Sequence, residues 1–103
     1  MGKYLLAYKG GSMAATEAER EAAMAAWGSW FGQLGSAVVD AGNPFGPSAA
    51  VGSGGVNGGA TSGLTGYSVI DADSLSAAGE LAKGCPVLAH GGSVEVYETI
   101  PIM

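Results

Sequence analysis

Two strand-to-helix patterns, one in each half of the chain, limit the possible folds more than any other feature of this sequence. In the first pattern, tyrosine, leucine and alanine alternate over residues 3–9 with a period near two, which is typical of a β-strand. Residues 10–12, Gly-Gly-Ser, interrupt the strand, and Thr16 with Glu19 forms a capping box that predicts the start of a helix. Gly35 is the residue type favoured just after a helix, so it predicts the end of this one.

The predicted first helix carries large apolar side chains along one side. Met24, Trp27, Phe31 and Leu34 recur at spacings of three and four residues, with Trp30 beside them. Such a stripe is typical of a helix that packs on a sheet, so we assign these aromatic residues to packing.

The second pattern begins with a strand over residues 67–72, after which Asp73 or Ser74 caps a second helix. A final strand is predicted over residues 93–99, because polar and apolar side chains alternate there. Between the two patterns, the β-branched residues of 36–40 predict one further strand.

The segment between the two patterns is rich in glycine. Residues 41–66 hold nine of the chain's 19 glycines, which indicates mostly loop. Within this segment, residues 48–51 predict a short strand and Asn57-Gly58 predicts the turn of a hairpin. An alternative, an anion cradle over residues 52–59, is disfavoured because the segment opens no helix.

The elements therefore follow the order strand, helix, strand, hairpin, strand, helix, strand. This order predicts a ferredoxin-like α+β fold, an antiparallel sheet with both helices on one face, in a single domain of residues 1–103. Two helices cover only one face of a sheet, so we expect the other face to pack on a second subunit in a homodimer. Two facing sheets would form a dimeric α+β barrel with a pocket for a small organic molecule between them.

Composition excludes several kinds of partner. The 103 residues include 4 Lys and Arg against 9 Asp and Glu, and this excess of carboxylates disfavours nucleic-acid binding. No apolar run approaches the length of about 18 residues that a membrane span needs. The N-terminal sequence is broken too soon by Lys9 to be a signal peptide, and a lone Cys85 agrees with a reducing compartment. We expect a cytoplasmic protein.

The sequence contains no motif for a cofactor or a metal ion. It lacks the glycine patterns of nucleotide-binding loops and the Gly-x-Ser-x-Gly pattern of serine hydrolases. A metal ion needs three or four ligands, and Cys85 with His90 would supply two. We expect no cofactor and no metal site, and an inert Cys85.

His90 is the candidate acid or base, because it is the only side chain with a reference pKa near neutrality. It precedes two glycines, in a loop that could direct it into the barrel. Asp40, at the end of a strand, could orient His90, and Tyr8 could donate a hydrogen bond to a substrate. The simpler interpretations are a solvent-facing histidine and an aspartate that caps a turn.

Three more residues are candidates for ligand contacts. If the valines of the final strand face the helices, Glu95 and Tyr97 point towards the partner sheet. A buried Glu95 would have a raised pKa suited to proton transfer, whereas an exposed one would be an ordinary edge charge. Tyr67 could line the same cavity as Tyr8, each as a hydrogen-bonding aromatic residue.

Five segments together resemble the YCII-related domain family, in particular its branch named for an Asp-Gly-Pro-Phe motif. In chain order they are KYLLAYKGG, WGSWFGQLG, DAGNPFGPS, GLTGYSVIDADS and LAKGCPVLAHGGSVEVYE. They cover most of the chain, and their order and spacing are similar to the family's. The resemblance implies the family's fold, a dimeric α+β barrel, and a bacterial source, since most members are uncharacterised bacterial proteins.

The sequence departs from the family at two places that concern chemistry. Gly42, Asn43, Pro44 and Phe45 stand where the family has Asp-Gly-Pro-Phe, and Asp40 is the nearest carboxylate. The other branch of the family has a proposed histidine and aspartate pair with the histidine near the first helix, and this helix contains no histidine. The resemblance therefore implies a fold more than a mechanism.

Three functions are consistent with these observations. The first is binding of a small organic ligand between the sheets of a homodimer. The second is a cofactor-free isomerase or lyase in which His90 transfers a proton, since some members of the family are lyase-like or isomerase-like. The third is regulation of an alternative sigma factor as partner, because some members are encoded beside such factors.

Overall fold

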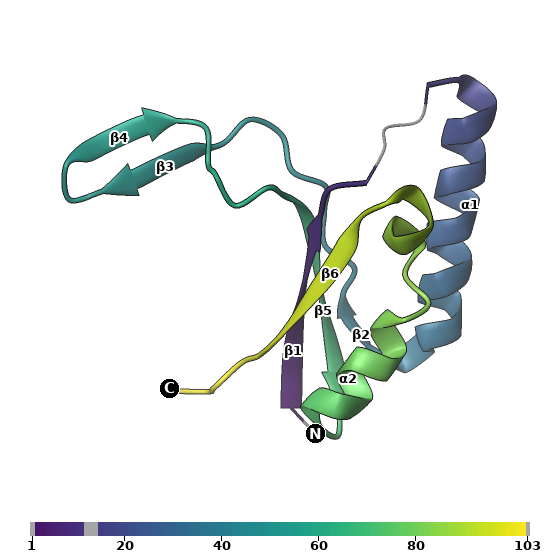
Figure 1. Ribbon diagram of the computed structural model, residues 1–103. Helices are drawn as coiled ribbons and strands as arrows, with labels where there is room; N and C mark the ends of the chain where they lie inside the picture. The colour runs from purple at the N-terminus through teal and green to yellow at the C-terminus, as the bar shows by residue number, and fades with distance from the viewer. Residues whose placement is uncertain (1, 12–14, 103) are drawn as a thin grey trace.

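The centre of the molecule is a sheet of four antiparallel strands in the order β2-β5-β1-β6 (Figure 1). The structure is a computed structural model that describes residues 2–11 and 15–102. The sheet comprises β1 (Gly2–Lys9), β2 (Val38–Asp40), β5 (Leu64–Ala72) and β6 (Ser93–Glu98), and the helices are α1 (Glu17–Leu34) and α2 (Leu75–Ala82). This strand order, with a helix after β1 and another after β5, is compatible with a ferredoxin-like fold and confirms the predicted α+β class.

Helix α1 begins and ends at the predicted residues. Thr16 Oγ1 accepts a hydrogen bond from the Glu19 amide at 3.1 Å, and Glu19 Oε2 accepts one from the Ala15 amide at 2.7 Å. At the other end, Gly35 has a φ of 57° and its amide donates to the Phe31 carbonyl. Residue 12, which the sequence places in the break before this helix, lies outside the described residues.

The remaining boundaries shift slightly from the prediction. Ser74, rather than Asp73, caps α2, because its Oγ accepts from the Ala77 amide at 3.0 Å. A 3₁₀ turn, η1 (Gly35–Ala37), occupies the start of the predicted strand 36–40 and delays β2 to Val38. None of the helices within the described residues is long and apolar enough to span a membrane.

One face of the sheet packs against both helices and forms the core (Figure 1). Tyr4, Leu6 and Tyr8 of β1 point to this face and are at most 5% exposed. Trp30 of α1 is buried with them, and its Nε1 donates a hydrogen bond to the Leu81 carbonyl of α2 at 3.2 Å. Both helices thus cover the same face, as the sequence predicts.

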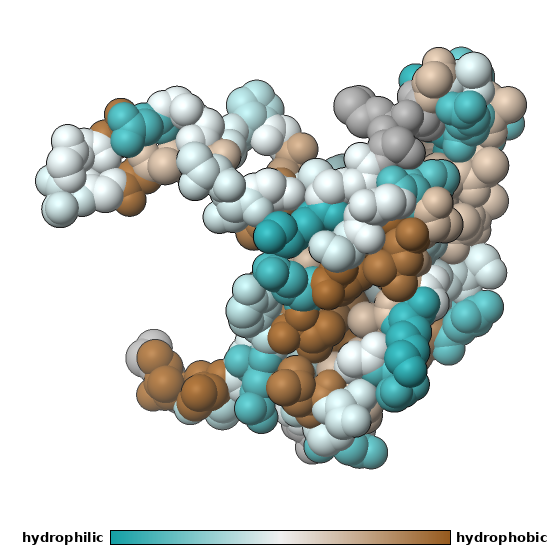
Figure 2. Space-filling model, viewed as in Figure 1, coloured by the Kyte–Doolittle hydropathy of each residue, from teal (hydrophilic) through white to brown (hydrophobic). Residues whose placement is uncertain are grey.

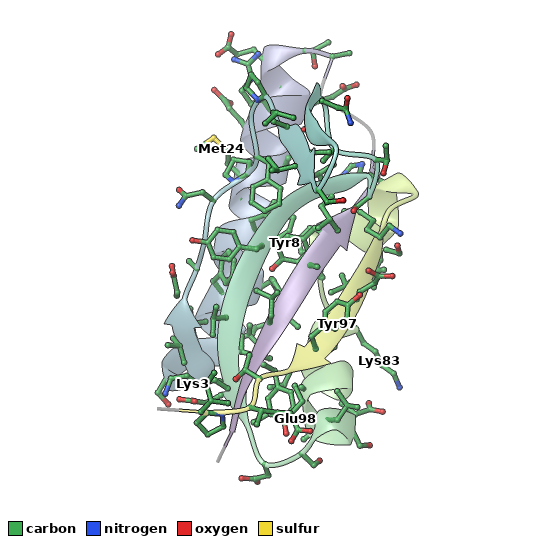
Figure 3. The ribbon with its side chains drawn as sticks, turned by 90° about the vertical axis from the view of Figure 1, so that its left-hand side faces the viewer. Lys3, Tyr8, Met24, Lys83, Tyr97 and Glu98 are labelled. Atoms are coloured by element: carbon green, nitrogen blue, oxygen red, sulfur yellow. The ribbon has the colours of Figure 1, made fainter. Side chains whose placement is uncertain are left out.

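Neither of the described α-helices covers the opposite face of the sheet, which Figure 3 shows towards the viewer. Leu5 lies opposite both Val69 and Tyr97 in the strand register, which forms an apolar row across three strands. Tyr67 also belongs to this face, whereas Tyr8 belongs to the helix face. The two side chains therefore leave the sheet on opposite faces, although both residues border one cavity between α1 and the sheet.

A separate two-stranded sheet, β3 (Ala49–Gly52) and β4 (Gly55–Gly58), extends away from the body (Figure 1). The hairpin itself is as predicted, but its turn lies at residues 53–54, and Asn57 pairs with Ala50 inside the hairpin. Asn57-Gly58 is therefore not the turn. The observed register places Val51 opposite Val56, and this apolar cross-strand pair favours it.

Candidate functional site

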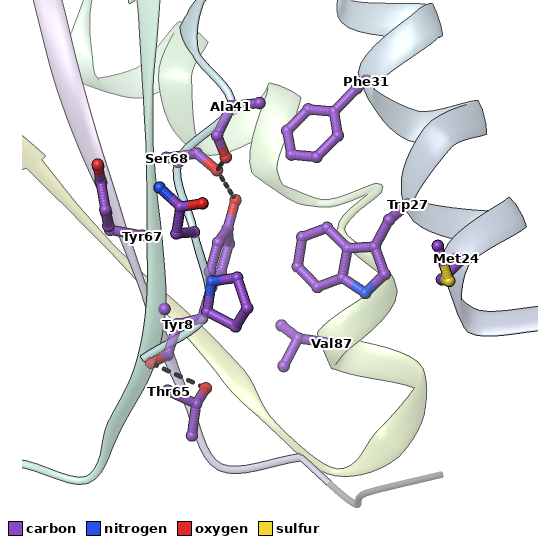
Figure 4. Close-up of a pocket in the computed structure, with 13 residues that line it drawn as sticks. Tyr8, Met24, Trp27, Phe31, Ala41, Thr65, Tyr67, Ser68 and Val87 are labelled. Atoms are coloured by element: carbon purple, nitrogen blue, oxygen red, sulfur yellow. Dashed lines mark hydrogen bonds between the residues drawn. The ribbon is translucent and has the colours of Figure 1, made fainter. Parts of the chain in front are cut away.

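A cavity of about 510 Å³ lies between α1 and the end of the sheet at which β1 finishes and β5 begins (Figure 4). None of the described residues of its wall carries a formal charge. The wall consists of Tyr8, Met24, Trp27, Phe31, Ala41, Gly42, Asn43, Pro44, Thr65, Gly66, Tyr67, Ser68 and Val87. The cavity therefore belongs to one chain and lies on the helix side of the sheet.

Three aromatic side chains form the main apolar wall. The rings of Tyr8 and Trp27 meet edge to face with centroids 5.0 Å apart, and Trp27 lies 5.9 Å from Phe31. Trp27 and Phe31 are only half-buried, and Met24 is 70% exposed. The predicted packing role is confirmed for the buried Trp30 and for Trp27 and Phe31, which pack against the core. Trp27, Phe31 and Met24 also border the cavity.

Two buried hydroxyl groups form the polar part of the cavity wall (Figure 4). Tyr8 Oη donates to Ser68 Oγ at 2.7 Å, and Ser68 Oγ donates to the Ala41 carbonyl at 2.6 Å. Burial raises the pKa of Tyr8 to about 12, against the smaller lowering effect of its bond to Ser68. Tyr8 therefore stays neutral, and its oxygen keeps a lone pair that can accept a hydrogen bond from a ligand.

The rim of the cavity, residues 41–45, is held on β5 by backbone hydrogen bonds. The Phe45 amide donates to the Thr65 carbonyl at 2.9 Å, and the Tyr67 amide donates to the Asn43 carbonyl at 3.4 Å. The rings of Phe45 and Tyr67 also stack with centroids 5.8 Å apart. These contacts hold the rim against β5.

Gly42 lets the rim approach β5 closely. Its φ is +76°, and a Cβ at this position would lie 1.7 Å from the Tyr67 carbonyl oxygen. The Asp40 carboxylate accepts a hydrogen bond from the Gly42 amide at 2.9 Å and caps this turn. A side chain such as the aspartate of the Asp-Gly-Pro-Phe motif does not fit at residue 42 in this conformation.

His90 lies apart from this cavity, at the end of a 3₁₀ helix, η2 (Pro86–His90), where the sequence predicted a loop. It is exposed and borders a second hollow of about 340 Å³ together with Trp30 and Cys85. No hydrogen bond joins His90 to Asp40 or Tyr8 in the part of the chain that the structure describes. Its role as an acid or base stays a prediction.

Glu95 and Tyr97 lie on the uncovered face, as predicted from valines that face the helices. Tyr97 Oη donates to Glu95 Oε1 at 3.0 Å, and this bond, with the charge of Glu95, raises the pKa of Tyr97. Lys9 Nζ lies 3.8 Å from Glu95 Oε2. Both Glu95 and Tyr97 are exposed in the single chain, and the two alternatives for Glu95 stay predictions.

Ser68 and Gly42 were not among the site residues predicted from the sequence. A signal for Ser68 exists in the sequence, because it lies between Gly66 and Ile70 in the alternation that faces the core. A polar side chain in that row requires a buried partner, which Tyr8 supplies. Gly42 carries no comparable signal among so many glycines.

Cys85 is buried, and this burial raises the pKa of its thiol to about 11. The thiol is therefore protonated at neutral pH, in agreement with the prediction of an unreactive cysteine. Among residues 2–11 and 15–102, no three His, Cys, Asp or Glu side chains lie close enough together to hold a metal ion.

Comparison of the chain with protein-family models, with curated proteins and with solved structures gives no match. The resemblance to YCII-related domains therefore stays a prediction. The geometry of the cavity is the basis for the function proposed below.

Proposed function

We propose that the protein binds a small, uncharged and mainly aromatic molecule in the cavity between α1 and the sheet. The observation that supports this is a cavity of about 510 Å³ with a wall of Tyr8, Trp27 and Phe31 beside a neutral hydroxyl pair. Small-molecule sites typically measure about 300–1,000 Å³ and combine apolar walls with a few placed polar groups.

The chemistry of the wall selects the class of ligand. Aromatic rings on one side favour a flat ring that can pack against them. A carboxylate or an ammonium group would lose its hydration here without meeting an opposite charge, so charged ligands are disfavoured. Tyr8 Oη can accept one hydrogen bond, which favours a ligand with a single hydroxyl or N–H donor.

Binding is better supported than proton transfer. A tyrosine with a pKa of about 12 is a poor acid or base at neutral pH. His90, the candidate for that chemistry, borders the other hollow. The proposed ligand site also differs in place from a pocket between two sheets, because it is enclosed by the helix and sheet of one subunit.

Calorimetric titration with 2-naphthol and 2-naphthoate tests the proposal, because the two probes share a ring system and differ in charge. We expect 2-naphthol to bind at least about tenfold more tightly, which corresponds to about 1.4 kcal/mol. Ala41→Phe should fill the cavity and weaken 2-naphthol binding about tenfold or more. Ala25→Phe, on the exposed side of α1, is the matched control and should leave binding unchanged.

Two results would contradict the proposal. Equal binding of both probes would show that the uncharged wall does not select the ligand. Binding that Ala41→Phe leaves intact would place the ligand elsewhere on the molecule.

A further inference from the structure

The chain exposes more surface than a compact protein of its mass. Its accessible surface is 6828 Å² at a mass of 10.1 kDa, against roughly 5,300 Å² expected for a compact monomer. The radius of gyration is 15.0 Å, against about 13 Å expected for a chain of this length. The excess of roughly 1,500 Å² exceeds the surface of about 800 Å² that each partner buries in a standard interface.

The excess comes from two projections on the side of the uncovered sheet face. One is the hairpin β3–β4 and the other is the C-terminal segment, and Figure 2 shows a hollow between them. Val51 and Val56 pair across the hairpin and are 76% and 69% exposed. Ile100 and Ile102 of the C-terminal segment are 77% and 88% exposed. Two-stranded hairpins are at best marginally stable alone in water, so an apolar hairpin of this kind favours a partner surface.

The uncovered sheet face offers such a surface, because its apolar row of Val69, Leu5 and Tyr97 crosses three strands. This row lies on the side of the sheet towards which the β3–β4 hairpin extends (Figures 1 and 3).

Charge favours a second copy of the chain as the partner over a basic protein. On the uncovered face Lys3 lies opposite Asp71, and Lys9 pairs with Glu95 at 3.8 Å, so these four charges balance. The whole chain carries a net charge of -5, and two copies would repel each other through most other surfaces. A basic partner protein is disfavoured, because the charges on this face balance and give it no excess of negative charge to bind.

We propose that the chain forms a closed homodimer in which the β3–β4 hairpin of each subunit packs its valine pair on the uncovered sheet face of the other. The contact is reciprocal, so two hairpins and two sheet faces are covered by one two-fold arrangement. This interface lies on the opposite side of the sheet from the ligand cavity, and it does not depend on the proposed ligand.

Sedimentation equilibrium of the full chain over a range of concentrations tests the interface. We expect the measured mass of the wild type to be twice the chain mass of 10.1 kDa. Val51→Asp with Val56→Asp should raise the dimer dissociation constant at least about 100-fold, because charges would replace the buried pair. Both valines are exposed in the single chain, so circular dichroism should show an unchanged fold.

The matched control adds the same charge elsewhere. Ala18→Asp with Ala25→Asp alters exposed residues of α1, and the dissociation constant should change by less than about threefold.

A second variant replaces residues 49–58 with two glycines. The Gly59 amide donates to the Ser48 carbonyl at 2.9 Å, and the Ala60 amide donates to Ser48 Oγ at 2.8 Å, so a short turn can join the base of the hairpin. We expect this variant to be monomeric.

Three results would overturn the proposal. One is a wild type that stays monomeric at the highest soluble concentration. Another is a dimer whose dissociation constant is unaffected by loss of the hairpin, because the sheet faces alone would then hold it. The third is growth beyond two chains, which would show that the hairpins do not pair reciprocally.

Discussion

The hydroxyl pair in the cavity wall should contribute measurably to stability, and Ser68→Ala is the change that tests it. Ser68 is 0% exposed and Tyr8 is 5% exposed, so the bond between the two hydroxyls is largely shielded from bulk water even though both residues border the cavity. The substitution removes the acceptor of Tyr8 Oη and the donor to the Ala41 carbonyl. A buried polar group left without a partner costs about 1–3 kcal/mol, so we expect Ser68→Ala to lower the free energy of unfolding by about 2 kcal/mol.

A double-mutant cycle separates the hydrogen bond from other effects. Tyr8→Phe should cost about 1 kcal/mol, because Ser68 keeps its bond to the Ala41 carbonyl. The double variant should cost about 2 kcal/mol rather than the sum of about 3 kcal/mol, since Tyr8 no longer has a hydroxyl to leave unpaired. The coupling energy between the two residues is then about 1 kcal/mol.

Urea unfolding followed by circular dichroism measures these differences. Ser76→Ala, at an exposed residue of α2, is the matched control and should change stability by less than about 0.5 kcal/mol. The reasoning is refuted if the two cavity substitutions add to within about 0.5 kcal/mol, because the hydroxyls would then be independent. It is also refuted if Ser68→Ala costs no more than the control.

Two further predictions concern the rim of the cavity and alkaline pH. Gly42→Ala should lower the free energy of unfolding, measured with urea, by about 2 kcal/mol or more, because the added Cβ would overlap the Tyr67 carbonyl. Gly46→Ala is the control and should be nearly neutral, because its Cβ would meet nothing within 4 Å. Burial raises the pKa of Tyr8 from 10.0 to about 12 and that of Cys85 from 9.0 to about 11, so the unfolded chain releases these protons first. Stability should therefore fall as the pH rises from about 9 to 12, and Tyr8→Phe with Cys85→Ala should flatten that fall; an equally steep fall in the double variant would contradict this assignment.

The elements that the sequence predicted correctly are those fixed by local interactions. Thr16 and Ser74 begin the two helices through bonds to amides three residues later, and such bonds need no distant partner. The alternation in residues 3–9 likewise records which side chains face the core of β1. These signals were sufficient to give the element order and the uncovered face.

The turn of the hairpin shows where local preference is overruled. Asn57-Gly58 has the stronger intrinsic preference for a hairpin turn, yet the chain turns at residues 53–54. The observed register pairs Val51 with Val56, and Gly55 adopts a φ of +126° beside the turn. Because glycine is frequent throughout residues 41–66, several turn positions were available and the cross-strand pair decided among them.

The candidate site depended on contacts between residues far apart in the chain, and the sequence could not place them. Tyr8 and Ser68 are 60 residues apart, and Ser68 bonds to a carbonyl 27 residues earlier. The cavity exists because residues 41–45 pack on β5 and keep a space between that rim and the aromatic side chains of α1. Trp27 and Phe31 have the helical spacing of core residues and pack against the core, and only the position of the rim decides that they also border an open space. The serine in an apolar row therefore indicated the site better than the single histidine, His90. A buried serine hydroxyl needs a hydrogen-bond partner inside the protein, whereas an exposed histidine can bond to water.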